Sequence, residues 1–276
     1  MSDQTDKTAL GDRMKGYERI QTDLRFSCTK PVYARIDGRS FSKFTKGMKR
    51  PFDEGMSRAM IETTKYLVKE THASIGYTQS DEISLVWFAD EKTSKIFFNG
   101  RIQKMVSNLS SLATAFFMTE AMKKWPAKCS SRLPSFDCRV FELPSLQEAA
   151  NEFLWRELDA TKNSISMAAH HFFGDKATWG KTGEQKIQMM KDMGVDWNDY
   201  PAFFKRGTFV RNEQFEIELD AEELAKIPEK HRDINKKAIR RRMVEMDVPS
   251  FRTVTNRVDV VFREAAPVVG VDVIEP

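Results

Sequence analysis

The sequence is poor in cysteine and lacks both long apolar runs and a large excess of charge of one sign. Its three cysteines, Cys28, Cys129 and Cys138, lie far apart and form no CxxC pair. The spacing therefore indicates neither a disulfide framework nor a zinc site. No apolar run approaches the roughly 20 residues that a membrane-spanning helix needs, and the first residues are polar, unlike a secretory signal. We therefore expect a cytoplasmic protein with no membrane association.

The charge of the chain is nearly balanced. It has 44 Lys and Arg residues against 40 Asp and Glu residues, which gives a net charge of +4 over 276 residues. So small an excess does not predict nucleic-acid binding by itself, but it is compatible with local basic patches and local acidic metal sites. Hydrophobic residues make up 41% of the chain, which is ordinary for a globular protein with a sizeable core.

Hydrophobic periodicity predicts an ordered series of strands and helices in the first half of the chain. In chain order we expect a strand at 32–37, a helix at 54–71, the strands of a β-hairpin at 74–78 and 83–88, a helix at 101–124 and a strand at 136–143. This βαββαβ order is the ferredoxin-like split βαβ unit, an antiparallel sheet with helices packed on it. Polymerase palms and nucleotide cyclases share this α+β architecture, although the order alone implies neither activity.

The remaining segments give weaker patterns, which predict a mainly helical C-terminal extension. We expect helices at 15–24, from Pro144 to about 158, at 163–173, 181–193 and 221–245, a strand pair at 207–210 and 214–219, and a strand at 257–262. The chain is accordingly divided into a disordered N-terminus (1–13), a palm-like catalytic domain (14–160) and an extension (161–276) that packs on the palm.

Asp37 and Asp81 are the two carboxylates that such a sheet would bring together. Asp37 ends the first strand on the face opposite to Ile36, and Gly38 is expected to let the backbone turn sharply and expose its carbonyl oxygen. Asp81 and Glu82 occupy the hairpin tip, beside the end of the first strand. Two carboxylates and a carbonyl suit Mg²⁺ and substrate phosphates. The alternative is structural, because Asp-Gly and Ser-Asp-Glu are also common turn and hairpin-tip sequences.

Two long motifs resemble the tRNA-His guanylyltransferase family. They read Ala-Arg-Ile-Asp-Gly-Arg-Ser-Phe-Ser-Lys-Phe at 34–44 and Gly-Tyr-Thr-Gln-Ser-Asp-Glu-Ile-Ser at 76–84. The resemblance also takes in 136–139 and 155–156, ends near Lys205-Arg206-Gly207-Thr208 and covers about residues 14–212. It implies that Asp37, the Gly38 carbonyl and Asp81 hold two Mg²⁺ ions, with Glu82 supporting these catalytic ligands.

One motif departs from the members of this family that add guanosine to tRNA-His. Those members carry His-Ile-Asn-Asn-Leu-Tyr-Asn, whereas this chain reads Thr-Lys-Asn-Ser-Ile-Ser-Met at 161–167 and keeps one asparagine, Asn163. The stretch is similar to the guanylyltransferase-like branch, which is associated with templated repair of 5′-truncated tRNAs. The resemblance implies that nucleotides are added in the 3′–5′ direction to the 5′ end of tRNA, after ATP or GTP activates its 5′-phosphate. It also implies a homotetramer.

Further predicted site residues would contact nucleotides and RNA. Arg101, Lys104 and Asn108 share the polar face of the long helix, where they would neutralise a triphosphate or form a solvated face. The predicted nucleotide-binding residues are Gly38, Arg39, Ser40, Phe41, Lys43, Arg50, Ser80, Arg101, Lys104 and Asn108. The predicted RNA-binding residues are Asn163, His170, Lys205, Arg206, Lys236, Lys237, Arg240 and Arg241. The last four belong to a basic run that suits tRNA phosphates, or else to a solvated charged helix.

The sequence leaves two other functions open. A nucleotidyl cyclase on the same palm would use the same metals and would need no RNA. A non-catalytic tRNA-binding protein could keep the fold, but RNA binding alone gains nothing from carboxylates that repel phosphates.

Overall fold

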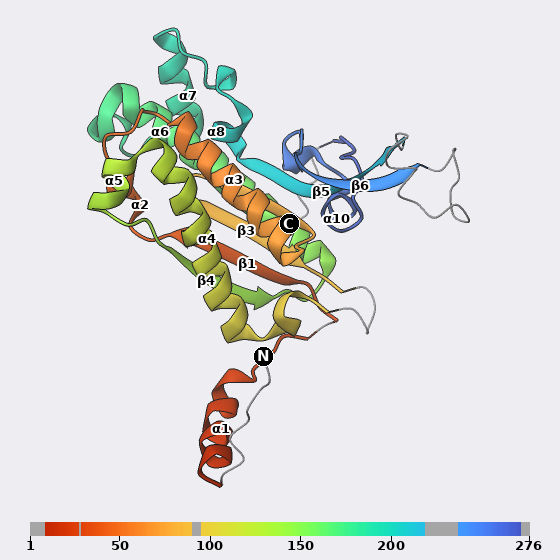
Figure 1. The fold of residues 1–276 in the computed structure, drawn as a ribbon. Coiled ribbons are helices and arrows are strands. Elements are labelled where there is room, and N and C mark those ends of the chain that lie inside the picture. Colours follow the sequence, from red (N-terminus) through yellow and green to blue (C-terminus); the bar gives the residue numbers. More distant parts are fainter. Residues whose placement is uncertain (1–8, 28, 90–94, 219–236, 272–276) are drawn as a thin grey trace.

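A six-stranded antiparallel sheet forms the centre of the computed structural model, which describes residues 9–27, 29–89, 95–218 and 237–271 (Figure 1). The strand order is β4-β1-β3-β2-β5-β6. The strands are β1 (Val32–Gly38), β2 (Ile75–Gln79), β3 (Glu82–Trp87), β4 (Phe136–Glu142), β5 (Thr208–Ile217) and β6 (Ala238–Glu245). The first four strands have the arrangement of a ferredoxin-like unit, so the predicted α+β palm-like fold is confirmed.

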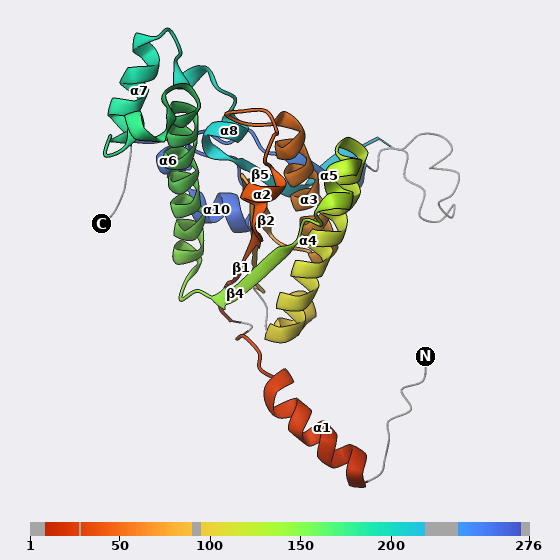
Figure 2. The same cartoon turned by 90° about the vertical axis from the view of Figure 1, so that its left-hand side faces the viewer.

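Helices cover both faces of this sheet (Figure 2). Helices α3 (Glu54–Thr71) and α4 (Ile102–Lys124) pack on one face, and α6 (Leu146–Thr178) with α10 (Arg257–Phe262) packs on the other. Side chains alternate across β1, so that Ala34 and Ile36 belong to the first core while Tyr33 belongs to the second. Because both faces are covered, β1 is apolar along most of its length and ends on the polar residue Asp37 before Gly38.

Smaller helices and 3₁₀ turns surround this core. They are α1 (Ala9–Thr22), α2 (Phe41–Phe44), α5 (Pro126–Ser131), α7 (Gly183–Asp192) and α8 (Ala202–Arg206), with 3₁₀ turns η1 (Phe97–Gly100), η2 (Trp197–Asp199) and η4 (Phe251–Thr253). α1 stands away from the body of the molecule in both views (Figures 1 and 2), and it includes residues 9–13 of the predicted disordered N-terminus. None of the helices in the described ranges is both long and apolar enough to cross a bilayer.

The C-terminal half differs from the sequence-based predictions in three places. Residues 238–245, predicted as helix, form β6, because they pair with β5 and set Arg242 opposite Glu213 in the register. The two short strands predicted at 207–210 and 214–219 are one strand, β5, whose central Arg-Asn-Glu resembles a turn only in composition. Residues 257–262, predicted as a strand, form α10, because helical geometry buries Val260 and Val261 against the core beneath α6.

α6 is also longer than predicted. The sequence predicts one helix to about residue 158 and another over 163–173, whereas α6 runs from Leu146 to Thr178 with a break at Gly174, where φ is 73°. The division of the chain at residue 160 stays a prediction, and α6 runs through that point. The helix extends from the second core, where Phe153 is buried, to the pocket at the end of β1, where Asn163 lies.

Candidate nucleotide and metal site

The end of β1 lies beside the tip of the β2–β3 hairpin. The register sets Asp37 opposite Glu82, and the Gly38 amide donates a hydrogen bond to the Asp81 carbonyl oxygen at 3.0 Å. The structure therefore brings Asp37 and Asp81 together across 44 residues of sequence. The antiparallel ladder sets this approach, because it joins the end of β1 to the start of β3.

The carboxylates of Asp37 and Asp81 are crowded. Burial raises the pKa of Asp37, and the neighbouring Asp137 carboxylate raises it further. Burial likewise raises the pKa of Asp81, as does the charge of Asp37, while the Ser80 hydroxyl, which donates a hydrogen bond to Asp81 Oδ1 at 3.0 Å, lowers it. In the described part of the chain neither carboxylate has a basic side chain within 4.0 Å. Two desolvated negative charges that repel each other suit a cation that would neutralise both.

Gly38 is required for a reason other than the sharp turn that the sequence suggests. Its φ lies outside the left-handed region, and the left-handed residue is Ser40, with φ 56°. A Cβ atom on Gly38 would lie 2.4 Å from the ring of Phe41 and 2.9 Å from the Cβ atom of Asp81. The absent side chain thus lets β1, α2 and the hairpin tip meet closely.

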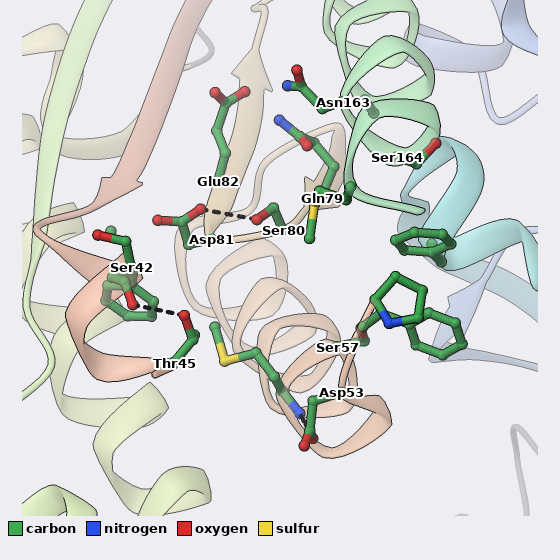
Figure 3. A pocket seen from close by; sticks show the side chains of 18 of the residues that line it. Ser42, Thr45, Asp53, Ser57, Gln79, Ser80, Asp81, Glu82, Asn163 and Ser164 are labelled. Atoms are coloured by element: carbon green, nitrogen blue, oxygen red, sulfur yellow. Dashed lines mark hydrogen bonds between the residues drawn. The ribbon is translucent and has the colours of Figure 1, made fainter. Parts of the chain in front are cut away.

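A pocket of about 780 Å³ opens at this junction (Figure 3). Its polar wall combines the hairpin tip with α6, on which Asn163 lies above the hairpin tip in the close-up. The Ser164 hydroxyl points the other way and donates hydrogen bonds to the Thr161 and Lys205 carbonyl oxygens. Its apolar wall contains Pro51, Phe52, Met56, Met167, Phe203 and Phe204. The rings of Phe52 and Phe204 stack with centroids 4.6 Å apart. The pocket therefore offers acidic oxygens at one side and aromatic surface at another.

Glu82 is held by α6 rather than pointing free into the pocket. Arg156 donates from Nε to Glu82 Oε1 at 2.6 Å and from Nη2 to Oε2 at 2.9 Å. Arg156 Nη2 also donates to Asp159 at 2.9 Å, and Asp159 accepts from Asn163 at 3.1 Å. A chain of charge-assisted hydrogen bonds therefore joins the hairpin tip to the α6 wall.

The predicted site residues divide into two groups by position. Those that line the pocket are Asp37, Gly38, Ser40, Phe41, Arg50, Ser80, Asp81, Glu82, Asn163 and His170. Those that do not line it are Arg39, Lys43, Arg101, Lys104, Asn108, Lys205, Arg206, Lys237, Arg240 and Arg241. Lys236 lies outside the described residues.

The start of α4 is distant from the carboxylates within one chain. Arg101 forms an isolated β-bridge with Arg25, and Lys104 Nζ lies 5.7 Å from the centroid of the Phe98 ring. Figure 1 shows this end of α4 at the end of the sheet opposite to α2. The structure therefore does not bring Arg101 and Lys104 to Asp37 and Asp81.

The basic run on β6 lies among acidic side chains. Lys237 pairs with Glu216 at 3.1 Å, and Arg241 lies 3.8 Å from Glu264. The adjacent Arg242 lies 3.6 Å from Glu213. β6 is exposed, but neighbouring acidic side chains compensate most of its charge. The sequence-based prediction of a charged helix did not include these neighbours.

Several pocket residues were not among the predicted site residues. Asp53 caps α3 by accepting from the Met56 amide at 3.0 Å, a role that its place before an apolar helix could have indicated. The aromatic wall joins Phe52 to Phe203 and Phe204 across about 150 residues of sequence. No local pattern connects such distant residues, so no signal in the sequence indicates this wall.

Comparisons with known proteins agree with this architecture. A family model described as tRNAHis guanylyltransferase matches residues 11–144. A bacterial tRNA(His) guanylyltransferase-like protein solved in complex with ATP is 39% identical, with a TM-score of 0.69, over 74% of this chain and 88% of that chain. A bacterial tRNA(His) guanylyltransferase-like protein in complex with GTP is 32% identical, with a TM-score of 0.70, over 93% of this chain and 98% of that chain. The tRNA(His) guanylyltransferase of Schizosaccharomyces pombe is 27% identical over 71% of this chain and 77% of its own length.

Proposed function

The chain belongs to the tRNA-His guanylyltransferase family, and on that premise we propose that it is a nucleotidyltransferase that extends the 5′ end of tRNA in the 3′–5′ direction. The observation that carries the proposal is the crowded pair of carboxylates, Asp37 and Asp81, in a pocket of about 780 Å³. This volume lies within the range of small-molecule sites. Structures of similar proteins with ATP and with GTP support nucleoside triphosphates as substrates.

Asp37, Asp81 and the Gly38 carbonyl oxygen are the groups that would hold Mg²⁺. The fit rests on their chemistry, because hard oxygen ligands suit Mg²⁺ and the two carboxylates repel each other without a cation. Bound Mg²⁺ would increase the acidity of the attacking hydroxyl and stabilise charge on the leaving phosphate. The other named residues would position substrates around this centre.

The reaction would proceed in two phosphoryl-group steps. First, the 5′-monophosphate of the RNA attacks ATP or GTP, forms a phosphoanhydride and releases pyrophosphate. The 3′-hydroxyl of an incoming nucleotide then attacks the α-phosphorus of the activated end, and the activating nucleotide leaves as a monophosphate. Phe52 and Phe204 offer aromatic surface on which a nucleobase would stack, and Ser80 would orient the Asp81 carboxylate. The chain supplies position and electrostatics, so no side-chain nucleophile is needed.

The RNA would enter beside α6, where Asn163 and His170 line the pocket. Lys205 and Arg206 at the end of α8, and Lys237, Arg240 and Arg241 on β6, remain proposed RNA contacts. A homo-oligomer is also proposed. It is supported by α1, where Leu10, Tyr17 and Ile20 are 58%, 62% and 67% exposed on a helix none of whose residues is buried.

The decisive test uses a tRNA transcript that lacks its 5′-most nucleotide and carries a 5′-monophosphate. It is incubated with labelled GTP, ATP and Mg²⁺, and the products are resolved at single-nucleotide length. We expect the wild type to lengthen the RNA until its acceptor stem is fully paired, and the Asp81→Asn variant to be inactive. Asp247→Asn, at an exposed position that does not line this pocket, is the matched control.

Two results would contradict the proposal. If both proteins bind tRNA but neither activates nor extends it, the pocket is not a polymerase site. If nucleotide turnover instead proceeds without RNA and gives a cyclic product, the palm supports intramolecular chemistry.

A further inference from the structure

Two segments, one that follows β1 and one that ends α4, carry basic residues without acidic ones. Residues 39–52 contain five Lys or Arg residues and residues 121–135 contain four, and neither segment contains Asp or Glu. The whole chain has 44 basic and 40 acidic residues, so the rest of it holds 35 basic residues against all 40 acidic ones. The net positive charge of the chain therefore comes from these two segments, although residues 234–244 also hold five basic residues and no acidic one.

The fold joins the two segments into one surface. Lys128 Nζ, on α5, donates a hydrogen bond to the Lys46 carbonyl oxygen at 2.7 Å. The rings of Trp125 and Phe44 meet edge to face with centroids 6.5 Å apart. Helix α5 therefore packs beside the segment that follows β1. We call Lys46, Lys124, Lys128 and Arg132 the α5 basic surface.

Among the described residues no acidic side chain lies within 4.0 Å of the charged groups of this surface, although Glu54 and Lys124 line the same small pocket. Lys46, Lys124 and Arg132 are exposed, and Lys128 is half-buried. In the part of the chain that the structure describes, one ion pair within 4.0 Å involves a side chain of the two segments. It joins Lys123 to Glu120 at 2.6 Å. The basic run on β6 differs, because its side chains lie beside Glu213, Glu216 and Glu264. Uncompensated cations are the ones that can exchange their counterions for phosphates.

The α5 basic surface is continuous with the rim of the pocket. Lys49 and Arg50 follow Lys46 in the chain and line the pocket that contains Asp37 and Asp81. We propose that the α5 basic surface binds the phosphate backbone of the RNA stem whose 5′ end enters this pocket. This inference rests on the proposed function and adds where the body of the RNA lies, along α5 and the end of α4. An anchored stem would hold its 5′-phosphate near the carboxylates while successive nucleotides exchange.

The test compares two variants that each lose three positive charges. The first is Lys46→Gln/Lys124→Gln/Arg132→Gln, which changes exposed residues outside the pocket lining. The control is Lys69→Gln/Lys95→Gln/Lys176→Gln, which changes exposed residues elsewhere. The dissociation constant for tRNA is measured between low and high KCl, and the KM values for GTP and ATP are measured alongside.

We expect the first variant to bind tRNA about tenfold or more weakly at moderate salt. The slope of log Kd against log [KCl] should fall by about one for each phosphate that the protein no longer neutralises. Extension at saturating tRNA and the KM values for nucleotides should stay near those of the wild type. The control should match the wild type in Kd and in slope.

The surface proposal and the function proposal fail in different ways. If the wild type extends tRNA but the first variant binds it as tightly and with the same salt slope as the control, the surface assignment is wrong. If the first variant keeps tRNA binding but loses binding to phosphatidylserine vesicles, the partner is a membrane and the assignment is again wrong. If the wild type binds tRNA through this surface yet extends no transcript, the enzymatic function is the part that fails.

Discussion

At the scale of single residues, Gly38 matters through the volume that it leaves empty. The Phe41 ring occupies that space and is only 2% exposed. It packs against Phe44, Phe117 and Phe136, with centroids 5.5, 5.3 and 4.8 Å away. Since these rings are close-packed, any shift of Phe41 away from position 38 would disturb the cluster. A methyl group at position 38 would therefore push the strand end away from Asp81.

We predict that Gly38→Ala destabilises the fold by about 2–3 kcal/mol, as overpacking in a rigid core does, and also lowers nucleotidyltransfer. Thermal unfolding and the extension assay would measure both effects. Gly16→Ala is the matched control, because no atom lies within 4 Å of the position that its added methyl would take on exposed α1. A Gly38→Ala protein as stable as the control would show that the Phe41 cluster can relax.

The carboxylate pair gives a second prediction at this scale. Removing one charge relieves a repulsion that burial strengthens, so Asp81→Asn should unfold at a slightly higher temperature than the wild type in EDTA. Mg²⁺ should stabilise the wild type, by about 2.7 kcal/mol at a hundredfold excess over its Kd, and should leave Asp81→Asn almost unchanged. An equal Mg²⁺ response in both proteins would mean that the ion binds elsewhere.

At the scale of elements, the sequence predicts the part of the site that lies in the first four strands. Alternation locates β1, and a polar hairpin tip locates Asp81, so their convergence follows from the sheet order. The C-terminal elements could not be predicted in the same way. β6 is a strand because β5 pairs with it, and the aromatic wall depends on how α8 meets Phe52. Local periodicity contains no information on such long-range partners.

The ion pair between α6 and the hairpin tip is the contact between elements that we expect to contribute most to stability. Arg156 and Glu82 are both largely buried, at 5% and 7% exposure, and share a two-point ion pair. Burial raises the pKa of Glu82, and the hydrogen bonds and charge of Arg156 act against that rise. Of the charged partners within the described residues, removing Arg156 leaves Glu82 with only the more distant Arg35, at 3.8 Å. Removing Glu82 likewise leaves Arg156 with Asp159 alone. Breaking a buried pair in this way typically costs up to about 3–5 kcal/mol.

We predict that Arg156→Met and Glu82→Met are each strongly destabilising, while the double variant recovers at least about 2 kcal/mol of the summed loss. Denaturant unfolding of the four proteins gives this coupling energy. The exposed pair Lys30 and Glu142, 3.0 Å apart, should give less than about 1 kcal/mol in the same cycle. Equal coupling in the two pairs would mean that burial adds nothing to the α6 interaction.

At the scale of the whole molecule, charge is unevenly distributed along the chain. The two segments beside the pocket hold nine basic residues and the remainder of the chain is net acidic. An RNA would therefore be attracted most strongly to the α5 end of the molecule, which favours one orientation on approach. The small overall charge of +4 conceals this polarity.

A buried carboxyl group, that of Glu157 on α6, is one of the contacts that bind η4 to the rest of the molecule. Glu157 Oε1 accepts hydrogen bonds from the Phe251 amide at 2.8 Å and the Ser250 hydroxyl at 3.1 Å. Burial raises the pKa of Glu157 to about 7, against the lowering effects of these two donors and of Arg206. The carboxyl therefore binds its proton more tightly in the folded state than in the unfolded state.

This shift predicts a defined pH dependence of stability. Between the unfolded pKa, about 4.5, and the folded pKa, about 7, the native state holds the proton and the unfolded state does not, so stability falls as the pH rises through this window. Above the window the cost is about 3 kcal/mol at most. Glu157→Gln keeps an acceptor oxygen and cannot ionise, so it should match the wild type at pH 5 and exceed its stability at pH 8. Denaturant unfolding at both pH values measures the difference, and a difference that does not change with pH would show that Glu157 titrates alike in the folded and unfolded states.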